Sequence, residues 1–541
     1  MSVRRVMGSE TEFGVLAVGE PHANATVLST RVVTSYALRV ARELSRESSG
    51  RNGSDGQTSV GTGWDYGSEA PLSDARGYTM SREQAHPSQL TDQAPVLTAE
   101  EIAAEAITES AMYTEDMDWR KVIMNTVIPN GARVYVDHSH PEYSSPEVTT
   151  PLDALTWDAA GDVVAARAVA ELARGAEKTG TPAVNLYKNN TDNKSVSYGA
   201  HENYMVDRAV PFDRITSALL PFFATRQIMC GAGRVGLGVD GSEPGFQLSQ
   251  RADFFERTVG LETTIHRPIV NTRDEPHALA TKFRRLHVIV GDANMSQFSN
   301  FLKLGMTKLV LDCIEADVDF SDLRLANAVD EIKQVSHDPT CTHRLLLVDG
   351  RRLTAIELLR EYRERAAALP DLDEVDAKVL RLWGEVLDDL ERDPLSTADR
   401  LDWTAKWALI SRYLERGVPI SDPKLKLIDI QYADIDPAKS LYHALVCKGQ
   451  MRTLVDEEAI RRAVTVPPED SRAWFRGKVS EKFGEAIIAS SWQSVLFAVG
   501  DQPIRFPMDE VDGLTRAEVG ELIERAETVE SLLKGLESHH V

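Results

Sequence analysis

The sequence has few cysteines and no long apolar run. Its four cysteines stand far apart, and none has the C-x-x-C spacing that zinc and redox sites use. We expect reduced thiols at Cys230, Cys313, Cys341 and Cys447. No run of about eighteen apolar residues is present that could cross a bilayer, and the first residues lack an apolar signal core. These absences predict a cytoplasmic protein with no membrane partner.

Positive charge is also scarce. The chain carries 60 Lys and Arg residues against 83 Asp and Glu residues, a formal net charge of −23. Binding to nucleic acid needs a basic face, and the field of this chain would repel a polyanion. The charge therefore excludes a general nucleic-acid partner and leaves only a local basic groove for an acidic one.

The rest of the composition is that of an ordinary folded protein. Hydrophobic residues make up 42% and charged residues 26% of the 541 positions, and a chain of this length buries a large core without disulfides or metals. The pair Pro467-Pro468 would stop regular structure. We place a boundary there, which predicts a main domain over residues 1–465 and a small C-terminal domain over 466–541.

Residues 45–96 have the character of an insertion in the main domain. Residues 45–60 are rich in Gly, Ser and Asn, which predicts a mobile loop. The part that follows contains rigid, aromatic or charged residues in otherwise soft sequence: Trp64, Tyr66, Pro71 and Arg76. This part is either a docking element or a surface flap packed by its own aromatics, and the sequence alone does not separate the two.

Apolar residues recur at three- and four-residue spacing in several segments, which predicts helices. These segments are 29–44, 98–111, 153–175, 300–316, 354–368 and 372–392. A further helix is expected to begin after Thr515, because Thr515 and Glu518 form a T-x-x-E capping box. It should run as one apolar stripe to about residue 536.

Several short strands alternate apolar residues with residues that bind metals or phosphates. Side chains two positions apart on a strand share a face. In residues 127–143 the turn at Asn130-Gly131 predicts an antiparallel hairpin. After this turn, Val134 and Val136 should face the core. The opposite face carries Arg133, Tyr135 and Asp137, and His138, His140 and Glu142 follow.

Three more segments show the same alternation. Their polar faces carry Glu10 and Glu12 in residues 6–15, His201 and Asn203 in 199–206, and Arg285 and His287 in 282–296. Taken singly, each residue is more often structural than a ligand. Together, carboxylates on one face destabilise a fold unless a cation neutralises them, and oxygen ligands suit Mg²⁺. With arginines nearby to hold phosphates, this face predicts a cradle for a divalent metal and phosphates.

Residues 231–236, GAGRVG, match the G-x-G-x-x-G pattern of dinucleotide-binding proteins. The pattern has that meaning only between a strand and a helix, and the sequence that follows, LGVDGSEPG, does not start a helix. We therefore expect residues 230–246 to be a flexible glycine-rich loop lining a site, without NAD or FAD.

Six blocks carry a resemblance to a known family. They are GSETEFG (8–14), NGARVYVDHSHPEYSSPE (130–147), HENYM (201–205), SQRADFFE (249–256), RRLHVIVGDANMSQFSNFLK (284–303) and RLDWTAKW (400–407). Over nearly the whole chain, the sequence resembles the Pup ligase and Pup deamidase/depupylase family of the glutamine-synthetase-like carboxylate-amine ligases. The insertion, with WDYGSEAPLSDARG at 64–77, resembles a loop of the deamidase/depupylase branch that the ligase lacks.

The resemblance implies an α+β fold, with a glutamine-synthetase-like antiparallel β-sheet cradle packed with helices and a small C-terminal domain. It implies Mg²⁺ and ATP, or ADP with phosphate, as cofactors. It also implies site residues, position by position. The metal shell would be Glu10, Tyr135, Glu142, His201 and His287; the nucleotide contacts Ser144, Ser145, Asn203, Arg251 and Arg285, with Trp403 packing the adenine; and the catalytic residue Asp137.

Asp137 beside a metal would stay ionised, because the cation favours the charged form. It can then act as general base on water, or as nucleophile, toward the C-terminal Gln of Pup or the isopeptide that joins Pup to a lysine. The resemblance thus implies deamidation of Pup and depupylation of pupylated proteins. An acidic protein substrate requires a locally basic groove. Arginines available for it lie in the 205–285 region and in the C-terminal domain, where they are Arg461, Arg462, Arg472 and Arg476.

Three alternatives stay open. A Pup–protein ligase would share the cradle and turn over ATP to form the isopeptide. A small-molecule ligase of the glutamate-cysteine type would be indifferent to Pup. A catalytically silent Pup-binding adaptor would lose nothing when Asp137 is replaced by Asn.

Overall fold

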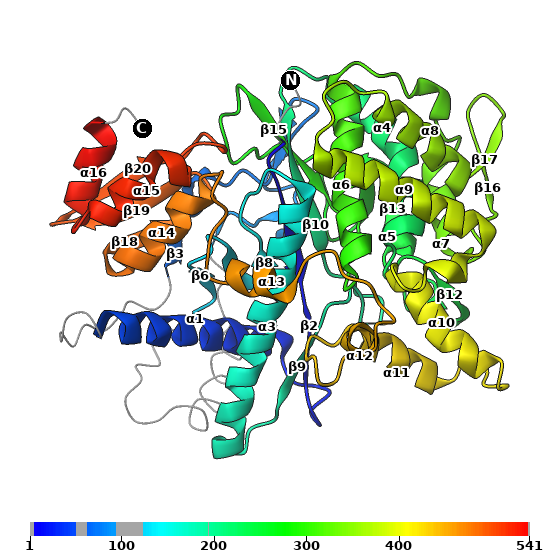
Figure 1. Cartoon of the computed structure of the whole chain (residues 1–541), viewed down its shortest axis with the longest axis horizontal. Helices are drawn as coiled ribbons and strands as arrows, with labels where there is room; N and C mark the ends of the chain where they lie inside the picture. Colours follow the sequence, from blue (N-terminus) through cyan, green and yellow to red (C-terminus); the bar gives the residue numbers. More distant parts are fainter. Residues whose placement is uncertain (1–4, 50–61, 94–122, 193, 539–541) are drawn as a thin grey trace.

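The computed structural model describes residues 5–49, 62–93, 123–192 and 194–538. Its centre is a six-stranded sheet in which every neighbouring pair is antiparallel (Figure 1). In spatial order the strands are β15 (Phe283–Val288), β10 (Ala200–Asp207), β1 (Met7–Glu12), β8 (His140–Ser144), β7 (Arg133–Asp137) and β6 (Asn125–Val127). The predicted α+β fold with an antiparallel sheet is confirmed.

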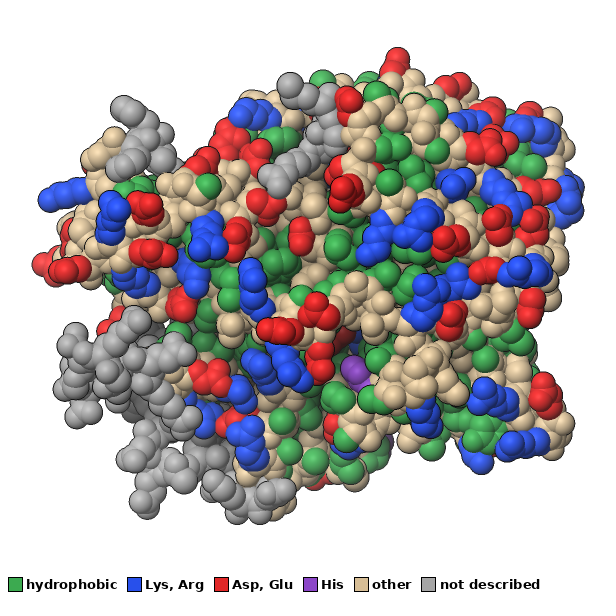
Figure 2. Space-filling model, viewed as in Figure 1, with side chains coloured by type: hydrophobic (Ala, Val, Ile, Leu, Met, Phe, Trp, Pro, Cys, Tyr) green, Lys and Arg blue, Asp and Glu red, His purple; other side chains and the backbone are tan. Residues whose placement is uncertain are grey.

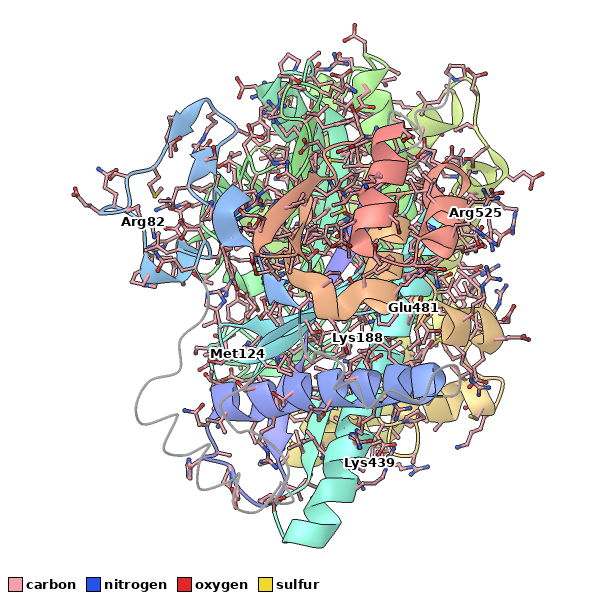
Figure 3. The ribbon with its side chains drawn as sticks, turned by 90° about the vertical axis from the view of Figure 1, so that its left-hand side faces the viewer. Arg82, Met124, Lys188, Lys439, Glu481 and Arg525 are labelled. Atoms are coloured by element: carbon pink, nitrogen blue, oxygen red, sulfur yellow. The ribbon has the colours of Figure 1, made fainter. Side chains whose placement is uncertain are left out.

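One face of this sheet is apolar and lies under helices. Helix α1 (Ala25–Ser49) contacts β7 and β8, α3 (Pro151–Thr179) contacts β1, and α6 (Gln297–Glu315) contacts β10. Figure 3 shows α1 crossing α3 on this side of the molecule. Val134 and Val136 point into this core, as their alternation predicts. The other face of the sheet is therefore free to carry polar residues.

The turn between β6 and β7 follows the prediction. Gly131 has φ +82°, a left-handed conformation that glycine adopts without strain. Its close surroundings also require glycine, because a Cβ atom there would lie 2.7 Å from the main-chain oxygen of Ala473. The hairpin thus fixes the register of β7, which carries Asp137.

Five of the predicted helices are present with slightly different ends. Besides α1, α3 and α6, these are α8 (Ala355–Ala367) and α9 (Glu374–Arg392), each of which begins with a capping box. Residues 45–49, expected in a loop, instead close α1. The predicted helix at 98–111 lies outside the described residues. Further α-helices in the described residues before the C-terminal part are α4 (Phe212–Thr225), α5 (Gln227–Cys230), α7 (Ala328–Ser336), α10 (Asp402–Leu414), α11 (Pro423–Tyr432), α12 (Leu441–Cys447) and α13 (Glu457–Ala463).

The C-terminal part has an apolar core of its own. It combines α14 (Ala473–Phe483), β18 (Ile487–Ser490), β19 (Ser494–Val499), β20 (Gln502–Pro507), α15 (Arg516–Arg525) and α16 (Val529–Ser538). The single helix expected over 515–536 is wrong, because the chain extends at Ala526 (φ −68°, ψ 123°). Ser531 N–H then bonds to Thr528 Oγ1 and starts α16, and both halves of the stripe still face one core.

The described part of the insertion joins this C-terminal sheet. Strand β3 (Gly63–Trp64) pairs in parallel with β18, and a small hairpin follows, made of β4 (Ser73–Asp74) and β5 (Tyr78–Thr79). Figure 3 shows Arg82 just beyond this hairpin, at the edge of the molecule. The described part of the insertion therefore connects the main sheet to the C-terminal sheet of β18, β19 and β20.

The glycine-rich segment at 230–246 differs from its prediction. Residues of β11 (Arg234–Leu237) and β12 (Glu243–Gln247) pair as an antiparallel hairpin that packs on α11. The G-x-G-x-x-G pattern thus begins after helix α5 and runs into strand β11, so it lacks the strand-then-helix context of a dinucleotide fingerprint. The prediction of a flexible loop lining a site is wrong. Other strand pairs are β2 (Gly14–Ala17) with β9 (Val184–Tyr187), β13 (Phe255–Gly260) with β14 (Arg267–Asn271), and β16 (Arg344–Leu346) with β17 (Arg352–Thr354).

The cysteines are all unpaired, as expected: Cys230, Cys313 and Cys341 are buried and Cys447 is exposed. Among the described helices, none combines the length and the apolar character that crossing a bilayer requires.

Candidate functional site

Strand register alone brings most of the predicted site residues together. Side chains opposite one another on neighbouring strands lie about 5 Å apart at their Cβ atoms. The rows across the polar face are His201–Glu10–Ser144 and Glu12–Glu142–Tyr135, with His287 opposite Asn203. The period-two alternation and the register together therefore assemble this face.

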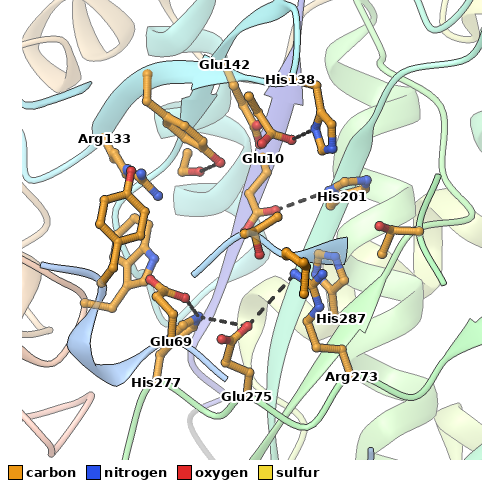
Figure 4. Close-up of a pocket in the computed structure, with 18 of the residues that line it drawn as sticks. Glu10, Glu69, Arg133, His138, Glu142, His201, Arg273, Glu275, His277 and His287 are labelled. Carbon is orange, nitrogen blue, oxygen red and sulfur yellow. Dashed lines mark hydrogen bonds and ion pairs between the residues drawn. The ribbon is translucent and has the colours of Figure 1, made fainter. Parts of the chain in front are cut away.

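Most of these residues line a pocket of about 350 Å³ (Figure 4). Among the predicted site residues, its lining includes Glu10, Tyr135, Asp137, Glu142, Ser144, His201, Arg285 and His287. The remaining lining comes mostly from the insertion and from the segment at 273–277. The pocket thus lies where three parts of the chain meet.

One group of possible metal ligands consists of Glu10, His201 and His287, whose ligand atoms all lie within 4.8 Å of one another. His201 Nδ1 lies 3.2 Å from Glu10 Oε2. Burial and then the charge of Arg285 hold the pKa of His287 well below its usual range, so its ring is neutral and can ligate a metal. Asn203 donates to Glu10 Oε1 at 3.0 Å and so fixes the carboxylate.

A second group consists of Glu12, Asp137 and Glu142, again within 4.8 Å. Burial, followed by the negative charges of Asp137 and Glu12, raises the pKa of Glu142 well above its usual range. Three crowded carboxylates with this mutual repulsion are the arrangement that a divalent cation would neutralise. The oxygen-rich set therefore fits Mg²⁺.

Asp137 ends strand β7 at the rim of this group. Burial alone would raise its pKa, but the charge and hydrogen bond of His138, together with the charges of His201 and Arg133, outweigh burial and lower it. His138 Nδ1 lies 2.9 Å from Asp137 Oδ2. Asp137 is therefore held as a carboxylate that can accept a proton or attack a carbonyl carbon.

A third group, Glu69, Glu275 and His277, was missed by the sequence reasoning. Glu69 comes from the insertion, and the other two follow β14. Burial and then the charge of Glu275 raise the pKa of Glu69 to about 7. Arg285 Nη2 donates to Glu275 Oε2 at 3.4 Å. The only signal in the sequence is the dense polar run RDEPH at 273–277.

The insertion forms one wall of the pocket. Tyr66, Glu69 and Ser88 line it, and Trp64 is buried against Trp492 with ring centres 5.3 Å apart. Arg133 lies between the Trp64 ring and the Tyr135 ring. A flap packed only by its own aromatics is therefore wrong, because this wall is fixed to the sheet.

The predicted nucleotide contacts fall into two sets. Ser144, Ser145, Asn203 and Arg285 line a smaller pocket of about 60 Å³, which also shares Glu10 with the large one. Arg285 Nη1 donates to Asn203 Oδ1 at 2.7 Å. These four residues therefore meet beside the two candidate metal groups.

Arg251 and Trp403 do not line either pocket. Trp403 is fully buried, and its indole N–H donates to the Ile228 carbonyl at 2.9 Å. Arg251 is also buried, with its guanidinium bonded to Ser197 Oγ at 3.2 Å and to the Ile289 carbonyl. Neither residue therefore reaches the other predicted nucleotide contacts: Trp403 joins helix α10 to helix α5, and Arg251 is held in the core by Ser197 and Ile289.

The arginines suggested for a basic groove are also divided. Arg472 and Arg476 are buried and both pair with Glu147, so they cannot offer charge to a partner. Arg461 and Arg462 are exposed. On the face in Figure 2, acidic and basic side chains are interspersed.

The profile of the family described as Pup-ligase protein matches residues 5–496. The chain belongs to the Pup ligase family. A depupylase from Acidothermus cellulolyticus is 46% identical over 549 residues, covering 99% of each chain. A Pup deamidase/depupylase from Mycolicibacterium smegmatis is 43% identical over 542 residues, covering 99% of this chain and 100% of the relative.

In the sequence comparison, a Pup–protein ligase aligns over a smaller share of this chain. A Pup–protein ligase from Gordonia bronchialis is 42% identical over 362 residues, which cover 65% of this chain and 79% of the ligase. In the crystal structure of the complex of Pup with its ligase PafA, one chain is 29% identical to this chain and superposes with a TM-score of 0.73. The match covers 99% of this chain and 95% of the chain in the complex. PafA with ADP gives 34% identity and a TM-score of 0.68, covering 82% of this chain and 98% of PafA.

Proposed function

We propose that this chain is an ATP- and Mg²⁺-dependent hydrolase that deamidates the C-terminal Gln of Pup to Glu and cleaves the Pup–lysine isopeptide. The observation that carries the proposal is the alignment of the whole chain with a depupylase and a Pup deamidase/depupylase, against 65% of it with a Pup–protein ligase. A small-molecule ligase has no such support.

Asp137 is the residue that we assign to the reaction. It acts either as general base on water or as nucleophile on the γ-carbonyl carbon of the Gln side chain. In both routes a water oxygen replaces the nitrogen, and the nitrogen leaves with the proton as ammonia or as the lysine amine. The same site therefore serves the free amide and the isopeptide.

The two groups of carboxylates and histidines would hold the metal ions. The crowding of Glu12, Asp137 and Glu142 supports this, because burial and like charge raise the pKa of Glu142 when no cation is near. Tyr135 pairs opposite Glu142 in the sheet and completes the set. When bound, Mg²⁺ supplies positive charge that polarises the carbonyl and neutralises phosphate.

The smaller pocket would hold the nucleotide. Its hydroxyls, amide and guanidinium (Ser144, Ser145, Asn203 and Arg285) are the donor types that suit phosphate and ribose oxygens. A solved structure of the related PafA contains ADP. Arg251 and Trp403 are not part of this assignment, because they are buried elsewhere.

The test uses Pup ending in Gln, Mg²⁺ and ATP, with no lysine acceptor. We expect mass spectrometry to show conversion of the terminal amide to the acid, and a pupylated protein to release Pup in a parallel reaction. A ligase would instead leave the amide unchanged and attach Pup ending in Glu to an added acceptor. A binding adaptor would do neither.

A further inference from the structure

His138 has a backbone conformation that brings it onto Asp137. Successive side chains on a strand point to opposite faces, so neighbours in sequence do not normally meet. His138 has φ +52°, in the left-handed region, directly after β7 ends. This turn places its ring beside the preceding carboxylate, with Nδ1 2.9 Å from Asp137 Oδ2.

The other ring nitrogen of His138 faces the pocket wall. Nε2 lies 3.2 Å from the main-chain oxygen of Ser88, which belongs to the insertion. A carboxylate and a carbonyl oxygen only accept hydrogen bonds, so both ring nitrogens must donate. The ring is therefore held at two ends.

The two hydrogen bonds of the His138 ring join Asp137 to a fixed part of the pocket wall. Among the described residues, His138 is the only hydrogen-bond donor to the Asp137 side chain, which is 28% exposed at the strand end. The Ser88 end is itself fixed, because Ser88 Oγ bonds to His86 Nδ1 at 2.7 Å and to Thr264 Oγ1. Without the ring, no other described side chain donates a hydrogen bond that sets which way the Asp137 carboxylate faces.

We infer that His138 is a positioning residue: its Nδ1–H holds Oδ2 of Asp137, its Nε2–H anchors the ring to the pocket wall, and the carboxylate is thereby aimed into the pocket. The inference rests on the proposed role of Asp137. The bond to Asp137 sets the direction of the carboxylate, and the bond to Ser88 only steadies the ring.

Two near-isosteric substitutions separate the two bonds. The amide nitrogen of Asn reaches the place of Nδ1, and that of Gln reaches the place of Nε2. We expect His138→Asn to keep kcat for Pup deamidation within about threefold, since it can still donate to Asp137. His138→Gln and His138→Ala should lower kcat about tenfold or more at unchanged KM, the effect of a lost hydrogen bond to a charged group.

Backbone strain is controlled by His138→Gly, because glycine adopts the left-handed region freely. It should lose as much kcat as His138→Ala. His343→Gln is the matched control, since His343 Nε2 pairs with Glu331 at 2.7 Å on a different element, and it should not change kcat. Equal kcat for His138→Asn and His138→Gln, or an effect on KM alone, would overturn the inference. Deamidation of Pup by the wild-type protein tests the proposed function separately from the role of His138.

Discussion

The guanidinium carbon of Arg133 lies 3.9 Å from the centre of the Trp64 ring. Arg133 belongs to the sheet, and Trp64 belongs to the insertion, so this cation–π contact joins the floor of the pocket to its wall. The opposite face of the guanidinium covers Tyr135 at 3.8 Å. Because Arg133 and Trp64 are both buried, the contact is stronger than an exposed one would be.

Trp64→Ala should loosen this wall. We expect the free energy of unfolding to fall by about 3 kcal/mol, as for other buried tryptophans, and the amides at 63–90 to exchange faster with solvent. Tyr78→Ala is the control, since Tyr78 lies in the same segment but is 48% exposed. Equal exchange in Trp64→Ala and wild type would show that the wall is held elsewhere.

Glu142→Gln should separate metal binding from stability. Removing one of three crowded carboxylates relieves repulsion, so the variant without Mg²⁺ should have a Tm at least equal to that of the wild type. Mg²⁺ should raise the Tm of the wild type and much less that of the variant. Thermal unfolding with Mg²⁺ and with NaCl of equal ionic strength measures this, and an equal Mg²⁺ effect in both proteins contradicts it.

The stability that Glu147 adds by pairing with Arg472 and Arg476 of the C-terminal part should be lost in acid. Burial opposes ionisation, but Arg476 and Arg472 outweigh it and lower the pKa of Glu147 from 4.5 to about 2. A lowered pKa adds stability that is present above pH 4.5 and lost as the pH falls toward 2. Glu147→Gln should therefore cost about 3 kcal/mol at neutral pH and less in acid.

Urea unfolding of both proteins across this pH range checks that prediction. Glu469→Gln is the control, because Glu469 makes a solvent-exposed pair with Arg516 and exposed pairs contribute little. A difference between wild type and Glu147→Gln that stays constant from neutral pH to pH 3 would refute the buried pairing.

Trp403→Phe should affect stability and leave nucleotide binding alone. The substitution removes the bond to the Ile228 carbonyl and leaves that buried oxygen unpaired, at a cost of about 1–3 kcal/mol. The nucleotide Kd should not change, whereas Arg285→Lys should weaken it. A weaker Kd for Trp403→Phe with normal stability would return Trp403 to the nucleotide site.

The sequence was most informative where local periodicity decides the geometry. Alternation along β1, β7, β10 and β15 predicts which side chains share the polar face, and the Asn130-Gly131 turn predicts the hairpin. The capping box at Thr515 predicts where α15 begins. These features depend on residues within a few positions of one another.

Contacts between residues far apart in the sequence depend on tertiary packing, which local periodicity does not determine. Glu69 and Glu275 belong to one group of possible metal ligands. Yet Glu275 is 205 residues away along the chain from Ala70, the residue next to Glu69, whose N–H donates to the Glu275 side chain. Trp403 lies in a motif that resembles the family, but its burial depends on packing against helix α5, which contains Ile228. The break at Ala526 leaves the apolar stripe intact, so the stripe alone could not reveal it.

The most direct test of the hydrolytic site is Asp137→Asn with Pup ending in Gln. Wild type and variant are compared for ammonia release in the presence of Mg²⁺ and ATP, and for nucleotide affinity in the same buffer. We expect the variant to lose about a hundredfold or more in rate and to keep its nucleotide Kd, because the amide can neither accept the proton nor attack. Ammonia release at the wild-type rate by Asp137→Asn would contradict the assignment of this carboxylate.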